Sequence, residues 1–557
     1  MDDITTMTCK QIGVRWILRR LETLCTWGRL TFKSKKSRSL VIKKGKVIQA
    51  RFKVQGETIP TISDSPIKAL GKLFDDSLCH SSEPKNIMDQ LLKWLNSIDN
   101  TPLPGNLKAW CFQFGIIPRL TWPFSLYCFP PSSVEAMEKK CSKFLRSWFG
   151  VSRSFSDVNL YSKTSPAALP ISSVVEEFKV CQVRSALLLS QSKDHVARST
   201  SIGIPTGKKW SANNAIQDAN CSLRIKDVVG TIARGKLGLG HYGNKQWSTA
   251  EPIDKRRMVI AEVKKQEEDL RHVKAVSLVS QGAWVNWEGI ERRPTSLGDL
   301  LCKPESSLSF FLRAVSDTLP SNTNLVRWGK LDDPTCLLCQ TRPATLNHVL
   351  SSCHKALSEG RYTWRHNKVL RVIGNELNSL ISEEIKVRSP QLQQMDFVRE
   401  GTAIGRLKKP KPSNKGLLFE ANDWQLQLDL DSKVVFPQEL VVTNLRPDVI
   451  LMSMSRKIIV LLELTVPWEE RVSLSHEIKF GKYEHLLIEA RQKGWRASCY
   501  PIEIGCRGFV SKSLSYMWRC LGLNSSRIKK VNSRLARETE MCSRWLWLKR
   551  NADWLSY

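Results

Sequence analysis

The chain has 557 residues, of which 85 are lysine or arginine and 53 are aspartate or glutamate, so its formal net charge is +32. A basic excess spread through the whole chain favours a polyanionic partner, most simply nucleic acid, and disfavours a structural or signalling protein without a nucleic-acid role. A ribosome-associated or merely basic protein is the alternative. No apolar run approaches the ~20 residues that a membrane-spanning helix needs, so we expect no membrane partner.

The length leaves room for about three or four domains. Residues 1–80 combine one short helix, expected over Lys10–Trp27, with strand-like pieces, which predicts an α+β unit. From 81 to 250, apolar residues recur at intervals of three and four, which predicts helices. Residues 251–325 open with a stretch dense in charges of both signs, and we interpret that stretch as the solvated face of an exposed helix.

A four-ligand pattern, C-x2-C-x8-H-x4-C, lies in the region 326–375 and consists of Cys336, Cys339, His348 and Cys353. The sixteen cysteines of the chain are otherwise mostly scattered, and the chain opens without a signal segment, so we expect reduced, intracellular thiols. Thiolates and an imidazole at this spacing can close a tetrahedral, structural Zn²⁺ site. His354 is a substitute ligand. A chance pairing of cysteines is the alternative.

Two basic segments lie on either side of the last predicted domain. Residues 376–416 mix lysines with Gly, Pro and Ser, which predicts a basic linker and weakly matches a nuclear localisation signal, so we expect a nuclear protein. Residues 526–557 form a basic C-terminal tail. Both segments are expected to contact phosphates and to make binding steeply dependent on salt. The residues predicted to do so are Lys408, Lys409, Lys411, Arg527, Lys529 and Lys530.

An isolated acid, Glu463, lies within an apolar run that reads as a strand over Ile458–Val466. Burying an unpaired carboxylate costs several kcal/mol, so Glu463 should meet a metal, a lysine or another carboxylate. Leu445–Leu451 reads as the preceding strand of a hairpin, and a turn centred between Ser455 and Arg456 places Asp448 directly opposite Glu463. Opposed Cβ atoms lie roughly 5 Å apart, close enough for two carboxylates to share Mg²⁺. An ordinary ion pair with a nearby Arg or Lys is the alternative.

Four downstream motifs together resemble the restriction-like endonuclease of LINE-type, non-LTR retrotransposons. They are Leu445–Ile450 (LRPDVI), Leu462–Arg471 (LELTVPWEER), Lys479–Tyr483 (KFGKY) and Ile502–Phe509 (IEIGCRGF). They follow the Cys/His pattern and the segment Gly360–Asn367, which is placed similarly in those polyproteins.

The N-terminal region resembles the reverse transcriptase of the same elements. Met1–Thr8 is similar to the metal-binding Asp-Asp turn of the palm, with Asp2 and Asp3 as the acids, and Leu70–Asp75 is similar to the later palm motif that grips the primer. The helices that follow resemble the thumb. Because family polymerases also need an aspartate from an earlier palm strand, we expect the polymerase core of this chain to be incomplete.

For the endonuclease, the resemblance implies a PD-(D/E)xK fold in which Asp448 and Glu463 bind Mg²⁺ and a lysine orients or deprotonates the attacking water. Thr465 occupies the usual lysine position. Family variants supply the lysine from the next helix, which offers Lys479 and Lys482, three residues apart, with Lys482 beside Tyr483 preferred.

The resemblance thus implies nicking of target DNA to prime cDNA synthesis on the element's RNA, and it leaves a homodimer for second-strand cleavage open. Two alternatives remain: a catalytically decayed nucleic-acid-binding remnant, and a fragment of a complete reverse transcriptase. The expected fold is multidomain α+β: a truncated palm (1–80), a helical thumb-like region (81–250), a charged helical linker (251–325), a zinc-knuckle region (326–375), a basic linker (376–416), an α/β restriction-endonuclease-like domain (417–525) and a basic tail (526–557).

Overall fold

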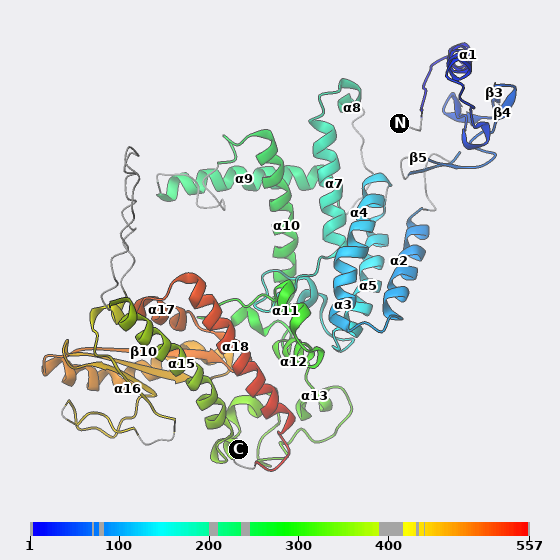
Figure 1. The fold of residues 1–557 in the computed structure, drawn as a ribbon. Coiled ribbons are helices and arrows are strands. Elements are labelled where there is room, and N and C mark those ends of the chain that lie inside the picture. Colours follow the sequence, from blue (N-terminus) through cyan, green and yellow to red (C-terminus); the bar gives the residue numbers. More distant parts are fainter. Residues whose placement is uncertain are drawn as a thin grey trace, which may run out of the picture. The chain divides into compact units, whose positions relative to one another are not determined.

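The structure is a computed structural model of the chain, shown in Figure 1. It describes residues 4–69, 72–76, 83–127, 129–199, 210–234, 246–388, 416–430, 434–438 and 440–554. The fold is mixed α and β, and it divides into two compact units. The first comprises 1–103, 107–144 and 172–267, and the second comprises 104–106, 145–171 and 268–557. Among the described residues, no helix is both long and apolar enough to cross a membrane.

The first unit contains three short hairpins and most of the N-terminal helices. The predicted helix at Lys10–Trp27 is present as α1, and the aromatic rings of Phe124, Phe129 and Phe178 pack edge to face in the interior of the later helices. The elements are α1 (Gln11–Trp27), β1 (Val41–Lys43), β2 (Lys46–Ile48), β3 (Phe52–Val54), β4 (Glu57–Ile59), β5 (Ile67–Ala69), β6 (Lys72–Phe74), α2 (Glu83–Asp99), α3 (Gly105–Cys111), α4 (Ile117–Leu126), α5 (Pro131–Trp148), α7 (Val174–Ser190), α8 (His195–Ser199), α9 (Ala212–Arg234) and α10 (Pro252–Ser277).

Helix α10 carries the charged stretch that the sequence analysis interpreted as a solvated face. Two of its acids are instead buried: Glu262, which accepts a hydrogen bond from Ser222 at 2.6 Å, and Glu268, which accepts one from the Thr164 backbone N–H at 2.7 Å. Nearby donors compensate their charge, so a dense charge pattern did not reveal which carboxylates face inward.

The second unit is built around a five-stranded sheet in the order β11-β10-β9-β8-β7. The chain passes from β9 through α16 to β10, which runs parallel to β9, whereas the other pairs are antiparallel. The elements are α6 (Asp157–Tyr161), α11 (Leu297–Cys302), α12 (Glu305–Val315), α13 (Asn322–Arg327), α14 (His354–Ser358), α15 (Arg361–Arg388), β7 (Gln425–Leu428), β8 (Val449–Ser453), β9 (Ile458–Thr465), α16 (Val472–Gln492), β10 (Arg496–Gly505), β11 (Phe509–Val510), α17 (Lys512–Leu521) and α18 (Ser525–Leu548).

Helices cover both faces of this sheet, α16 on one side and α15, α17 and α18 on the other (Figure 1). The apolar run of β9 is therefore buried throughout, as strands covered on two faces are. Leu462 and Leu464 point into the core beneath α15 and α18, whereas Ile459 and Leu461 pack against α16. Because side chains alternate along a strand, Glu463 lies on the α16 face.

The predicted hairpin register is confirmed. Val449 pairs with Leu462 and Ser453 with Ile458, so the same register carries Asp448 opposite Glu463 just beyond the end of β8. The region 526–557, expected to be a basic tail, instead contributes most of α18, whose apolar residues recur at intervals of three and four and are buried. The basic side chains of α18 led the sequence analysis to overlook this apolar stripe.

Candidate functional site

Glu463 is a buried carboxylate, with only 3% of its surface exposed, at the end of the β8–β9 hairpin. Its Oε2 accepts a hydrogen bond from the backbone N–H of Asp448 at 3.3 Å, which fixes the two acids side by side. The strand places Glu463 beneath α16, and that helix supplies the remaining partners.

Two lysines of α16, one turn apart, approach the same oxygen of Glu463. Lys479 Nζ lies 2.5 Å from Oε1 and Lys482 Nζ lies 3.4 Å from it. The structure thus brings together all four residues that the sequence analysis assigned to catalysis. Both lysine side chains remain partly exposed, although the acid that they approach is buried.

Tyr483, fully buried on α16, completes the surroundings of Glu463. Its hydroxyl lies 2.8 Å from Glu463 Oε2, and Lys482 Nζ donates to that hydroxyl at 2.9 Å. Burial, together with the neighbouring carboxylate charge, raises the pKa of the Tyr483 hydroxyl, so this hydroxyl stays protonated and can donate to Glu463.

Among the described residues, the side chain of Asp448 forms its hydrogen bonds through one oxygen, Oδ2. Oδ2 accepts the Leu464 backbone N–H at 2.7 Å and lies 3.3 Å from His366 Nε2. No described group donates a hydrogen bond to Oδ1. His366 lies 82 residues upstream on α15, within the segment Gly360–Asn367 that the resemblance marks, but neither its spacing nor its pattern predicts a contact with Asp448.

Thr465 stands where the family pattern has a lysine. Its hydroxyl oxygen is buried and has no hydrogen-bond partner among the described residues. The two amines that form ion pairs with Glu463 among the described residues, those of Lys479 and Lys482, both come from α16.

Oxygen ligands of this kind suit Mg²⁺, a hard cation that commonly binds through one or two carboxylates and water. Asp448 Oδ1 is available for such an ion, and Glu463 Oε1 faces the same side as the two amines. Holding an ion on Glu463 would require Lys479 to withdraw from its short contact.

The predicted zinc ligands also come together. The ligand atoms of Cys336, Cys339, His348 and Cys353 all lie within 4.8 Å of one another, and all four residues are buried. His354 is exposed and lies outside this group, so it is not the substitute ligand that the sequence suggested. Three sulfur atoms and one imidazole could hold a metal such as zinc, and no fifth ligand or open position is required.

Local hydrogen bonds shape the loop that presents Cys336 and Cys339. The Gln340 N–H donates to the Cys336 carbonyl at 2.8 Å, with Gln340 in the left-handed region at φ 56°. Although burial opposes it, hydrogen bonds led by that of the Thr341 hydroxyl lower the pKa of the Cys339 thiol to about 5. A thiol of low pKa is readily available as the thiolate that binds metal.

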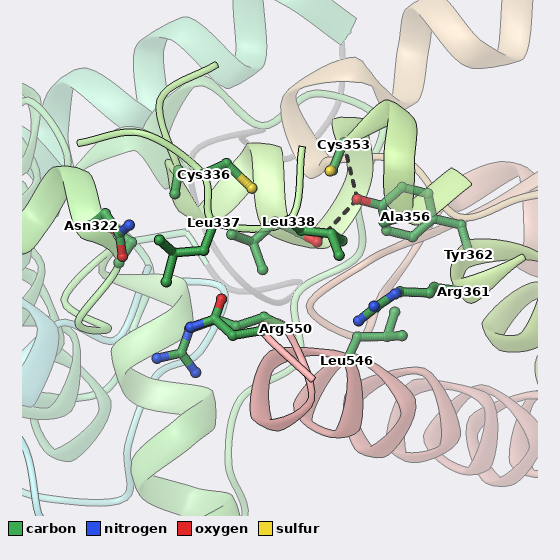
Figure 2. A pocket seen from close by; sticks show the side chains of 14 residues that line it. Asn322, Cys336, Leu337, Leu338, Cys353, Ala356, Arg361, Tyr362, Leu546 and Arg550 are labelled. Atoms are coloured by element: carbon green, nitrogen blue, oxygen red, sulfur yellow. Dashed lines mark hydrogen bonds between the residues drawn. The ribbon is translucent and has the colours of Figure 1, made fainter. Parts of the chain in front are cut away.

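A pocket lies beside this cluster, and Figure 2 shows Cys336 and Cys353 on its wall with Leu337, Arg361 and Arg550. In the same view the Tyr362 hydroxyl forms hydrogen bonds with the cluster backbone, including one from the Cys353 N–H at 3.1 Å. The first turn of α15 is thereby attached to the Cys/His cluster.

The other predicted site residues have mixed positions. Asp2, Asp3, Lys408, Lys409 and Lys411 lie outside the described residues. Lys529 and Lys530 are exposed on α18, where phosphates can reach them.

Arg527, by contrast, is engaged within the protein. It forms an ion pair with Glu376 at 2.6 Å and a second one with Glu383.

No family model matches the chain, and no curated protein sequence matches it either. Functional assignment therefore depends on the residues and contacts of the chain itself.

Proposed function

We propose that this chain is a Mg²⁺-dependent DNA endonuclease of the restriction-like type, belonging to a non-LTR retrotransposon protein, and that it nicks double-stranded DNA to prime cDNA synthesis. The observation that carries the proposal is the position of the two lysines: Lys479 and Lys482 both approach one oxygen of Glu463, whose neighbour is Asp448. Two adjacent acids and an amine form the minimal set that this chemistry needs.

The side chains divide the work as follows. Asp448 and Glu463 would hold the ion, with Asp448 contributing Oδ1, the oxygen that has no hydrogen-bond donor among the described residues. When bound, Mg²⁺ would neutralise charge on the scissile phosphate and polarise the attacking water. Lys482, whose side chain is the more exposed of the two, would orient the attacking water and, once it has released its own proton to solvent, would accept the proton of that water, while Lys479 balances the charge of Glu463.

Basic surfaces would supply the DNA and RNA contacts of this function. The net charge of +32 and the exposed pair Lys529 and Lys530 support phosphate binding that weakens steeply as salt increases. The Cys/His cluster, with zinc bound, would act as a folding centre, because four protein ligands leave no position for substrate.

A second function, nucleic-acid binding without cleavage, is favoured by one observation. Both oxygens of Glu463 already have partners: Lys479 on Oε1, and Tyr483 and the Asp448 N–H on Oε2. A decayed nuclease in which an ion pair satisfies the buried acid would show the same contacts.

Supercoiled plasmid incubated with the purified chain separates the two functions. The proposal expects Mg²⁺-dependent conversion to the open circle by the wild type, abolished by chelation and by Asp448→Ala or Glu463→Ala, with salt-sensitive DNA binding retained in both variants. Binding without any Mg²⁺-dependent nicking supports the second function, and nicking by the variants at the wild-type rate overturns the site assignment.

A further inference from the structure

His366 lies against Asp448, although it belongs to α15, 82 residues earlier in the chain. Its Nε2 is 3.3 Å from Asp448 Oδ2 and 3.2 Å from the carbonyl oxygen of Leu464. A carbonyl oxygen only accepts hydrogen bonds, so Nε2 carries a proton, and Nδ1, which faces the amide oxygen of Asn367, carries one as well. On the other side of the ring, Nδ1 lies 3.1 Å from Asn367 Oδ1, and the amide of Asn367 donates to the Leu430 carbonyl at 2.6 Å.

These contacts hold the ring of His366 in one orientation, and the ring in turn holds Asp448. With Oδ2 bonded to the Leu464 N–H and to His366, Asp448 keeps Oδ1 without a hydrogen-bond donor among the described residues. Groups that orient a metal-binding carboxylate in this way usually affect metal affinity without touching the ion.

One helical turn before His366, the same helix contacts the Cys/His cluster. The Tyr362 hydroxyl accepts the Cys353 N–H at 3.1 Å (Figure 2). The same hydroxyl lies 3.1 Å and 3.0 Å from the carbonyls of His348 and Val349. Residues four apart lie on the same side of a helix. The start of α15 therefore links the backbone of two cluster residues to the group that orients Asp448.

A buried arginine between them fixes this segment of α15 against the sheet. Arg365, which is 2% exposed, donates to the Val466 carbonyl at 3.3 Å and to Ser543 Oγ at 3.0 Å. A shift of the cluster backbone would thus pass through a rigid helix to Asp448 rather than be absorbed by a loop.

We propose that His366 is a positioning residue for the divalent-ion site, and that the Cys/His cluster sets its position through the Tyr362 hydroxyl. The two centres are then coupled: an ordered cluster keeps His366 on Asp448 and keeps Oδ1 directed at the ion. This inference rests on the proposed role of Asp448 as a ligand, but its measurement is ion binding in the absence of DNA.

Calorimetric titration with Mn²⁺, a probe for the Mg²⁺ position, tests His366 on the full zinc-loaded chain. His366→Leu, which keeps bulk and removes the donor, is expected to weaken Asp448-dependent Mn²⁺ binding about tenfold or more. His366→Gln restores a nitrogen donor and should stay within about threefold of the wild type. The matched control is His476→Asn, which removes a different histidine–carboxylate contact on the same sheet, at 2.9 Å from Glu503, and should leave Mn²⁺ affinity unchanged.

Tyr362→Phe tests the link to the cluster, with Tyr516→Phe, an exposed tyrosine, as the control. The expected result is a full zinc content with Mn²⁺ affinity lowered severalfold, and normal affinity in the control. Wild-type Mn²⁺ affinity in both His366→Leu and Tyr362→Phe overturns the proposal, as does a wild type that shows no Asp448-dependent Mn²⁺ binding.

Plasmid nicking by the wild type separates this inference from the proposed function. If the variants lose Mn²⁺ affinity but the wild type does not nick plasmid, the proposed nuclease function is rejected and the coupling of the two centres is supported. If the wild type nicks plasmid but the variants keep wild-type Mn²⁺ affinity, only the coupling is rejected.

Discussion

Glu463 and Glu469 are two buried acids six residues apart, and their surroundings differ. Glu469 is fully buried and pairs with Arg507, itself 1% exposed, at 2.6 Å between Nε and Oε2. The Arg507 guanidinium lies over the rings of Trp468 and Trp287, 3.7 Å and 4.3 Å from their centroids. This pair is thus buried, and the two tryptophan rings cover the guanidinium.

Glu463 is equally buried, but its partners are not. Lys479 and Lys482 have side chains 27% and 37% exposed, and the neighbouring Asp448 is 18% exposed. A buried acid whose partners reach solvent can exchange them for an ion or a substrate, whereas an acid sealed under tryptophans cannot. The difference teaches that the exposure of the partners, rather than the burial of the acid, separates a candidate site from a structural ion pair.

Breaking the closed pair should have the largest effect on folding. Arg507→Met leaves Glu469 charged and uncompensated, which is expected to cost about 3–5 kcal/mol in the free energy of unfolding. Urea unfolding followed by tryptophan fluorescence measures this loss. The double variant Glu469→Gln with Arg507→Met should recover part of it, and a single variant as stable as the wild type would contradict the closed-pair account.

At the Glu463 site, substitutions of the two lysines should have different effects, one mainly on the nicking rate and the other mainly on the free energy of unfolding. Lys482→Met is expected to lower the nicking rate about a hundredfold, the usual contribution of a positioned proton acceptor, with little change in unfolding. Lys479→Met should instead destabilise the fold, because Glu463 loses its closest partner. Rates and unfolding curves for both variants provide the test, and the reverse pattern would transfer the catalytic role to Lys479.

Tyr483→Phe should have a smaller effect. The change removes a buried donor from Glu463 Oε2 and keeps the ring, so we expect a loss of about 1–2 kcal/mol in unfolding free energy. Thermal unfolding measures it. A Tyr483→Phe protein more stable than the wild type would contradict the stabilising hydrogen bond from the Tyr483 hydroxyl to Glu463.

The smallest expected effect concerns His476 on α16, which is half-exposed and bonded to the buried Glu503 at 2.9 Å. The hydrogen bond to Glu503, which outweighs the opposing effect of burial, raises the pKa of His476. A raised pKa adds stability below the unfolded-state value of about 6.5, and that stability is lost as the pH rises through the folded-state pKa. The unfolding free energy of the wild type, measured by urea unfolding, should therefore fall slightly more between pH 6 and pH 8 than that of His476→Asn, by less than about 1 kcal/mol.

The sequence predicted those parts of the site that follow from local periodicity. The position of the turn predicted the β8–β9 register and thus the pairing of Asp448 with Glu463. Helical spacing predicted that Lys479 and Lys482 lie on one side of α16. The ligand spacing likewise predicted the Cys/His cluster. Each of these contacts forms within one hairpin, one strand–helix unit or one short loop.

Contacts made by packing distant elements were not predictable in this way. His366 contacts Asp448 only because α15 packs on the sheet. Arg507 contacts Glu469 only because the turn between β10 and β11, which carries Arg507, lies against the segment that follows β9. No periodicity in either segment specifies its partner. Helix α18 was missed for a different reason. Its apolar residues recur at helical spacing in the sequence, but its many basic residues predicted an exposed tail.

The central claim is that Glu463 belongs to a working nuclease site, and one comparison tests it most directly. Wild type, Glu463→Gln and Glu489→Gln, the last an equivalent change on the outer surface of α16, are incubated with supercoiled plasmid and Mg²⁺ after their folding has been verified. We expect nicking by the wild type and by Glu489→Gln, and a rate lowered at least about a hundredfold in Glu463→Gln. Equal nicking by all three proteins, or by none of them, would contradict the account.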